Sequence, residues 1–305
     1  MKYTFRVLSS EADKHLMFDL VRRFPEGNLH VCDMAYRLSS WALDDPKNVR
    51  LWFNQDGDLC AWAVMQTPFW TIDYIYHPAC EQDLHPDILA WADERAKAIY
   101  NAPSGHPTWY INVFSDQSCR IHDLEAHGFQ RQSDKSEDYW SKVFMCRASS
   151  TPVRVYPPPQ GFTVRSLAGK DEVEAYVQLH QAVFETKNMT LEWRRRILDQ
   201  PNYRPDLDVV VESPDSRLVA FCICWQDPIT LDGRVEPLGC HKDFRQYALG
   251  RVALSEGLHR LVASGARKIY VETGNERTTA LRLYEFFDFQ VIRDVLMLRK
   301  DYMPG

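Results

Sequence analysis

The chain has 305 residues, enough for two domains of about 150 residues, and its 45% hydrophobic and 26% charged composition is that of an ordinary globular protein. The net charge of −6 argues against nucleic acid as a partner, because phosphate contacts require a basic surface. The N-terminus has no apolar signal segment, and the longest apolar run, residues 218–225, is too short to cross a bilayer. We therefore expect a cytoplasmic protein that does not bind membranes.

The eight cysteines are scattered and form no Cys-x-x-Cys pair, so we expect reduced thiols rather than disulfides. Cys222 and Cys224 share one face of an expected strand, but no second ligand pair accompanies them. His77, Cys80 and His85 are too few ligands for a zinc site. We therefore expect no bound metal.

In chain order, the first half predicts strands at residues 5–7, 48–62 (a hairpin), 69–76 and 109–114, helices at 11–24 and 119–126, and a last strand pair ending near residue 145. A further helix is expected to open at Pro86 and run to about Tyr100, because proline is tolerated in the first helical turn. Residues 149–160 contain four prolines and predict a linker.

The second half predicts the same order of elements. Strands are expected at residues 162–167, 208–212 and 218–225, with helices at 171–184 and 191–198. A shift of 160 positions places Cys80 on Cys240, Leu89 on Leu249 and Tyr110 on Tyr270 without a gap. The sequence therefore predicts an internal duplication, with domains at 1–148 and 161–305 joined by the linker at 149–160.

The second copy contains a candidate anion site. A strand at residues 235–240 runs into a loop that begins with Arg245 and ends at Gly250, and a helix follows until Gly265. The N-terminus of a helix presents unpaired N–H groups and a partial positive charge, which favours a phosphate. Small residues at Ala248 and Gly250 permit a close approach, and the N–H groups of Gln246, Ala248, Gly250 and Arg251 are the expected donors.

A strand at residues 268–273, a turn at Gly274-Asn275 and a helix at 277–289 come next. The whole series resembles the GNAT family of acetyl-CoA-dependent N-acyltransferases. The loop from Arg245 to Gly250 is similar to the family's Arg/Gln-x-x-Gly-x-Gly/Ala motif, and Asn275, Ala280, Leu283-Tyr284 and Asp288-Phe289 are similar to its later helical motif. Ala248 and Asp288 depart from the pattern, because the family usually has glycine at both positions.

The resemblance implies an α/β (α+β) fold of two tandem GNAT domains, each with a mixed, mostly antiparallel central sheet flanked by helices. It implies transfer of an acetyl group from acetyl-CoA to a small-molecule amine in the C-terminal domain. The residues expected to hold acetyl-CoA are Leu238, Gly239, Cys240, Arg245, Gln246, Tyr247, Ala248, Leu249, Gly250, Arg251, Asn275, Ala280 and Tyr284.

Catalysis needs an acid for the leaving thiolate and a base for the amine. The resemblance makes Tyr284 the acid, although core packing would also explain a tyrosine in this apolar helix. Glu236 and Glu272 are both candidates for the base, and a salt bridge would equally explain either. Asn275 fits a contact with the coenzyme or a helix cap.

The first copy lacks this chemistry, since His85, Ile88 and Ala90 stand where the second has Arg245, Ala248 and Gly250, and Leu124 replaces Tyr284. We expect a degenerate half that shapes the acceptor pocket, as in tandem acetyltransferases of the mycothiol synthase type. Two alternatives stay open: a CoA-binding regulatory module without efficient transfer, and transfer of a longer acyl group. A monomer and a homodimer are equally compatible with the sequence.

Overall fold

The computed structural model describes residues 2–25, 29–102, 105–132 and 141–303. It divides into two compact units. The first unit contains Met1–Val143, Gly274–Glu276 and Arg293–Gly305, and the second contains Phe144–Thr273 and Arg277–Ile292. The chain therefore passes between the units more than once. In the described residues, no helix is both long and apolar enough to span a membrane.

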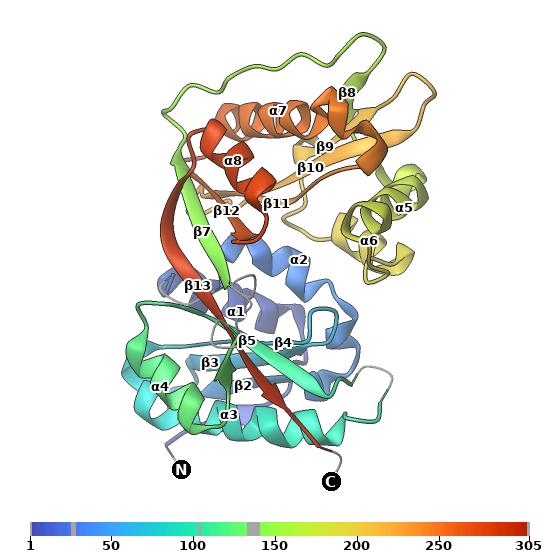
Figure 1. Ribbon diagram of the computed structural model, residues 1–305. Coiled ribbons are helices and arrows are strands. Elements are labelled where there is room, and N and C mark those ends of the chain that lie inside the picture. The colour runs from blue at the N-terminus through green and yellow to red at the C-terminus, as the bar shows by residue number, and fades with distance from the viewer. Residues whose placement is uncertain (1, 26–28, 103–104, 133–140, 304–305) are drawn as a thin grey trace. The chain divides into compact units, whose positions relative to one another are not determined.

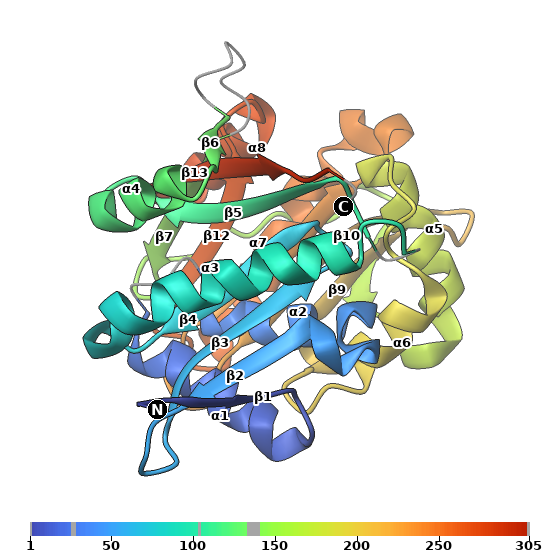
Figure 2. The same cartoon turned by 90° about the horizontal axis from the view of Figure 1, so that it is seen from below.

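The first unit has strands β1 (Thr4–Arg6), β2 (Val49–Phe53), β3 (Leu59–Gln66), β4 (Thr71–Tyr76), β5 (Thr108–Phe114) and β6 (Gln130–Arg131), and helices α1 (Glu11–Arg23), α2 (Met34–Leu38), α3 (Glu81–Ala98) and α4 (Ser118–Ala126). Its sheet has the order β1-β2-β3-β4-β5-β13, and β4 and β5 form its parallel pair. Helix α3 lies across the strands (Figure 2) and packs on β3 and β4 through Leu84, Ile88 and Trp91.

The expected start of this helix at Pro86 is wrong. Helix α3 begins at Glu81, directly after the 3₁₀ turn η4 (Pro78–Cys80), and Pro86 lies inside it. Glu81 and Asp83 place negative charge in the first turn, where the helix dipole favours it. Pro86 has no N–H to bond the carbonyl four residues earlier, and the helix nevertheless continues through it to Ala98.

The second unit has strands β8 (Thr163–Ser166), β9 (Asp208–Glu212), β10 (Leu218–Gln226), β11 (Gly233–Cys240) and β12 (Lys268–Gly274), and helices α5 (Val173–Phe184), α6 (Leu191–Leu198), α7 (Leu249–Ala263) and α8 (Thr278–Phe286) (Figure 1). Its sheet has the order β7-β12-β11-β10-β9-β8, in which β11 and β12 run parallel. Both sheets are mixed and mostly antiparallel, which confirms the expected fold class.

Helices α5 and α7 cover opposite faces of the second sheet. Phe221 on β10 packs against Tyr176 and His180 of α5, with ring centroids 5.2 and 5.9 Å apart. The next residue, Cys222, points to α7, where a Cβ on Gly257 would lie 2.8 Å from its Sγ. Successive side chains of a strand point to opposite faces, so the two helices sandwich β10.

The internal repeat is visible in the elements themselves. Strand β12 (Lys268–Gly274) lies 160 positions after β5, and α8 (Thr278–Phe286) lies 160 positions after α4. Two residues after the end of each helix the chain has a residue with positive φ, which is Gly128 (φ 88°) in the first unit and Asp288 (φ 65°) in the second. This left-handed residue explains why α8 stops earlier than the expected 277–289.

Each half of the sequence contributes its last strand to the unit formed mainly by the other half. Strand β13 (Gln290–Asp301), which the sequence did not predict, pairs antiparallel with β5 of the first unit from Val295–Phe114 to Asp301–Thr108. Strand β7 (Ser141–Ala148) contributes Phe144–Ala148 to the second unit, beside β12. A boundary at residues 149–160 stays a prediction about folding units, but it does not separate the strands of the two sheets.

Candidate active site

The loop after β11 leaves one helix end open. The 3₁₀ helix η9 (Lys242–Tyr247) leads to Ala248, which adopts φ 55°, and α7 then starts at Leu249. No side chain caps this helix. Leu249 and Gly250 are its first two residues, so their N–H groups have no carbonyl to bond within the helix. An uncapped helix N-terminus therefore lies where the sequence predicts an anion site.

Two of the expected donors are already used. The Ala248 N–H donates to the Arg245 carbonyl and the Arg251 N–H donates to the Ala248 carbonyl, each at 3.0 Å. The Arg251 guanidinium lies 4.6 Å over the Phe286 ring, which holds it against α8. Arg245, Gln246 and Tyr247 are exposed. Leu249 is fully buried, so the donor that a ligand can reach is the N–H of half-buried Gly250, and the loop side chains remain available to solvent.

Two glycines near this loop have different reasons to be small. A Cβ on Gly239 would lie 2.5 Å from Phe221 Cζ and 2.7 Å from Val183 Cγ1, so packing within the protein excludes a side chain there. A Cβ on Gly250 would meet only Cys240 Cβ, at 3.8 Å, which is an ordinary contact. The surface of Gly250 is open, and a phosphate can approach its backbone.

Strands β11 and β12 part beside the loop. In the described chain they pair only at Gly233–Ile269 and Arg234–Tyr270, although β11 continues to Cys240 and β12 to Gly274. On its other side β11 stays paired with β10 up to Ala220–Cys240. One backbone edge of residues 238–240 therefore faces the parting, where an extended amide-containing ligand can pair with it.

Tyr284 comes from α8 and is 6% exposed. Its ring packs edge-on against Phe289 at 5.7 Å, and Ala280 lies one turn before it on the same helix face. Burial raises the pKa of the Tyr284 phenol, and the charge of Glu236 raises it further. The phenol is therefore protonated at neutral pH.

The two carboxylates have different surroundings. Glu272 on β12 faces Arg234, with 4.0 Å between Oε2 and Nη2, and both side chains are mostly buried. Arg234, which the sequence analysis did not single out, thus gives the reason for a buried carboxylate on this strand. Glu236 is half-buried on β11, and its carbonyl accepts a 2.8 Å hydrogen bond from Trp225 Nε1.

Asn275 belongs to the first unit and is tied to β7. Its N–H donates to the Ser141 carbonyl at 3.0 Å, and its Nδ2 donates to Ser141 Oγ at 2.6 Å. The side chain is thus bonded to a strand, in place of the helix cap that was one of its two expected roles. In the described chain, no three His, Cys, Asp or Glu side chains gather closely enough to hold a metal.

In the first unit, the positions equivalent to the loop of residues 245–250 form no such loop. Residues 85–90 lie inside α3, where Pro86 has no N–H and the N–H groups of the other residues are spent on helical bonds. His85 bonds Tyr74 OH through Nε2 at 3.0 Å and Asp123 through Nδ1 at 3.1 Å. Arg120, which stands 160 positions before Ala280, donates to Tyr74 OH at 3.0 Å. A saturated polar network occupies this part of the first unit.

Comparison with known proteins agrees with this geometry. Residues 173–289 match the model of the acetyltransferase (GNAT) family. A GCN5-related N-acetyltransferase from Sphaerobacter thermophilus is 18% identical, with a TM-score of 0.69 over 100% of this chain and 97% of that one. A tandem GNAT protein from the clavulanic acid biosynthesis pathway is 11% identical, with a TM-score of 0.71 over 99% of both chains. No curated protein matches the sequence.

The chain therefore has the tandem GNAT fold throughout its length. Residues 173–289 of its second unit are a domain of the GNAT acetyltransferase family, and this domain makes the protein an acyltransferase.

Proposed function

We propose that the protein transfers an acetyl group from acetyl-CoA to the amine of a small molecule, at a single site in the second unit. The observation that carries the proposal is the open end of α7, where the uncapped N–H groups of Leu249 and Gly250 lie beside the parted strands. No comparable helix end exists in the described part of the first unit at the equivalent residues 85–90.

Acetyl-CoA fits this arrangement. The N–H group of Gly250, with the dipole of α7, suits a pyrophosphate. The free backbone edge at residues 238–240 suits the amides of the pantetheine arm, and an N–H there would polarise the thioester carbonyl. Exposed Arg245 offers a positive charge to the phosphates.

The residues divide the proton transfers between them. Glu236 accepts a proton from the acceptor amine, whose nitrogen then forms a bond to the carbonyl carbon of the thioester. The carbon–sulfur bond breaks, and Tyr284 donates its proton to the leaving thiolate. Glu272 is the weaker candidate for the base, because its charge is paired with that of Arg234.

The regulatory alternative drew its support from Ala248 and Asp288, which replace the family's glycines. Both residues adopt positive φ, at 55° and 65°, so the backbone keeps the conformation for which glycine is preferred. The departures leave the loop geometry intact, and this favours an enzyme. We extend the proposal to a cytoplasmic monomer or homodimer that uses acetyl-CoA rather than a longer acyl-CoA.

The Tyr284→Phe variant tests the mechanism. It keeps the ring that packs on Phe289 and removes only the acid, so kcat should fall by about 100-fold or more while acetyl-CoA binding is unchanged. Tyr302→Phe is the control. This buried tyrosine of the first unit donates a hydrogen bond to Asp93, and neither residue belongs to the proposed site. Equal kcat for Tyr284→Phe and the wild type would remove Tyr284 from the mechanism.

A further inference from the structure

A surface pocket of about 390 Å³ lies beside the loop that precedes α7. One wall is helix α5, and the other is formed by the turn between β9 and β10 together with His241 and Phe244 of the loop. His241 follows Cys240, and a Cβ on Gly250 would lie 3.8 Å from the Cβ of Cys240. The pocket therefore borders the helix end that is proposed to hold the pyrophosphate, and its volume is in the range of small-molecule sites.

Helix α5 leaves room for a ligand because it presents small side chains to the pocket. Ala175 and Ala182 are seven residues apart with Leu179 between them, so all three lie on one side of the helix. Both alanines are exposed, whereas Leu179 is buried and closes the floor. This floor is apolar and open to solvent, which suits a flat ring such as a nucleobase.

Arg217 brings a positive charge to the rim of the pocket. Its guanidinium lies 5.2 Å over the Phe244 ring, and its Nε donates to Asp215 Oδ2 at 2.6 Å. Among the described residues its two Nη groups have no hydrogen-bond partner, and 62% of the side chain is exposed. Both Nη groups can therefore donate to an anion.

The charges around the pocket favour an anion. In the described chain, the residues that line it include no carboxylate, and Arg217 is their one permanent cation. Asp215 bonds only the Nε of this arginine and is itself 57% exposed, so water and salt screen the pair. A phosphate that enters the pocket thus meets a cation and no negative wall.

The wall toward the loop is held by bonds within the protein. His241 Nδ1 accepts the Asp243 N–H at 3.3 Å, and the Phe244 N–H donates to the His241 carbonyl at 2.9 Å. Phe244 also packs edge-on against Phe162, with ring centroids 6.3 Å apart. The ring under Arg217 is therefore fixed in place before a ligand binds.

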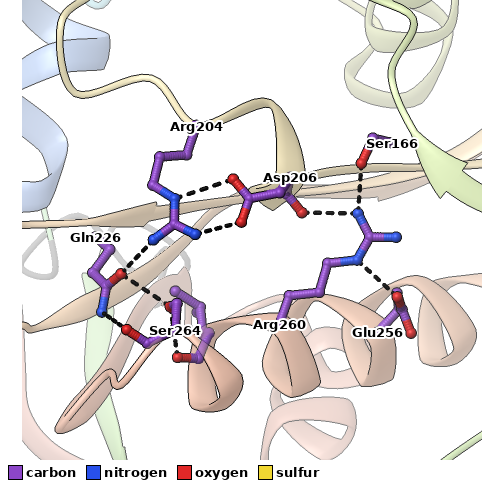
Figure 3. Close-up of polar contacts among 8 residues, drawn as sticks. Ser166, Arg204, Asp206, Gln226, Glu256, Arg260 and Ser264 are labelled. Atoms are coloured by element: carbon purple, nitrogen blue, oxygen red, sulfur yellow. Dashed lines mark hydrogen bonds and ion pairs between the residues drawn. The ribbon is translucent and has the colours of Figure 1, made fainter.

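The second polar pocket of this unit, of about 410 Å³, lies at the other end of α7 and differs in charge (Figure 3). Arg204 uses all three of its nitrogen atoms, with Nε and Nη2 on Asp206 and Nη1 on Gln226 Oε1. Arg260 donates to Glu256 at 2.7 Å. Each arginine there is paired with a carboxylate and bonded further, so this pocket gives an anion less reason to bind.

We propose that the pocket beside the loop binds the nucleotide end of CoA and that Arg217 recognises its 3′-phosphate. This rests on the proposed function and adds a specificity-determining residue to it. The ribose of CoA is joined directly to the pyrophosphate, so a pyrophosphate on Gly250 brings the 3′-phosphate and the adenine within a few bonds of the loop. The phosphate then pairs with Arg217, and the base covers the apolar floor between α5 and Phe244.

Two other arginines lie nearer to Gly250 in the sequence but are disposed differently. Arg251 is stacked over Phe286 of α8, 4.6 Å from the ring centroid. Arg245 does not line the pocket and stays available for the pyrophosphate. The two phosphate groups of the coenzyme therefore have separate cations, and a change of Arg217 acts on one of them alone.

Three ligands test the proposal by isothermal titration calorimetry of the full chain. They are CoA, dephospho-CoA, which lacks only the 3′-phosphate, and 4′-phosphopantetheine, which lacks the whole nucleotide. The wild type should bind CoA at least about tenfold more tightly than dephospho-CoA, because hydrogen bonds between charged groups are strong. Arg217→Gln should raise the Kd of CoA to that of dephospho-CoA and leave the Kd of dephospho-CoA unchanged.

Arg204→Gln is the matched control, because it removes a fully bonded arginine of the other pocket, and it should keep the preference for CoA. Ala182→Trp fills the floor, so it should weaken CoA and dephospho-CoA by about tenfold each without changing the Kd of 4′-phosphopantetheine.

The possible failures are distinguishable. Equal wild-type Kd values for CoA and dephospho-CoA, a preference that survives in Arg217→Gln or is lost equally in Arg204→Gln, or unchanged binding in Ala182→Trp would overturn the assignment and leave the proposed function intact. No binding of CoA by the wild type would overturn both.

Discussion

The two units place helices at equivalent points of the chain but begin them differently. In the second unit a 3₁₀ turn and the left-handed Ala248 delay the start of α7 to Leu249, and the first N–H groups stay open. In the first unit α3 starts at Glu81 and absorbs the same stretch into regular helix. One backbone conformation thus separates a helix whose first N–H groups lie in the predicted phosphate loop from one in which the same stretch is regular helix.

The side chains follow the same division. The first unit fills the region with Arg120, Tyr74 and His85, which bond one another, whereas the second has the small Ala280 at the position of Arg120. Loss of the phosphate loop and gain of a saturated polar network reinforce each other. Under the proposed function, the first unit therefore serves as a scaffold.

The exchanged strand gives the largest expected effect. Deleting residues 293–305 removes β13 from the first unit and exposes the edge of β5, which pairs with it over seven residues from Thr108 to Phe114. We expect loss of cooperative unfolding and aggregation through the bare strand edge. Deleting only residues 303–305, beyond β13, is the control and should leave thermal unfolding unchanged. A soluble truncated protein with the wild-type melting temperature would show that β13 does not complete the first unit.

Acid should destabilise both units through one buried histidine each. Burial, together with Arg120 in one case and Arg194 in the other, lowers the pKa of His85 and of His180 to about 4. The unfolded chain takes up these protons near pH 6.5 and the folded chain only near pH 4, so stability is lost as pH falls through this window. The loss is on the order of 3 kcal/mol per histidine at pH 4.

His180→Phe keeps the stacking on Phe221 and removes one of these groups. Urea unfolding between pH 7 and pH 4 should then show about half of the wild-type loss of stability in this window. Carboxylates such as Asp13, whose pKa is lowered by Arg6, contribute only at lower pH. An unchanged pH dependence would mean that His180 is not buried as a neutral imidazole.

The two glycines of the second unit sharpen the comparison further, because the first unit has Ala79 and Ala90 at the equivalent positions. Gly239→Ala should cost about 1–3 kcal/mol by overpacking against Phe221 and Val183. Gly250→Ala should be neutral or stabilising by up to about 1 kcal/mol, because alanine favours a helix and the site has room. Chemical denaturation of both variants measures this, and equal losses would contradict the reading of Gly250 as an open surface.

Local patterns in the sequence predicted much of this fold. Helix α6 (Leu191–Leu198) lies where its periodicity places it, and β5 and β12 keep the register of the repeat. The partner of a strand is not a local property, so the exchange of β7 and β13 could not be read from the pattern. The start of α3 was predicted wrongly because Pro86 was taken to lie in the first helical turn, whereas the helix begins five residues earlier at Glu81.

The candidate site was predictable in part for the same reason. The loop and Tyr284 are carried by contiguous motifs, which a resemblance can reveal. The left-handed conformation of Ala248 depends on its surroundings rather than on its side chain. The ion pair between Arg234 and Glu272 joins two strands and has no local pattern, so the sequence did not single out Arg234.

Native mass spectrometry of the full chain titrated with acetyl-CoA tests the central claim most directly. We predict one bound molecule per chain, none in Gly250→Trp, and one in Ala90→Trp, which places the same side chain on the exposed face of α3 at the equivalent position. Two bound molecules would show that the first unit has kept a working site, and none would contradict the proposed acetyltransferase activity.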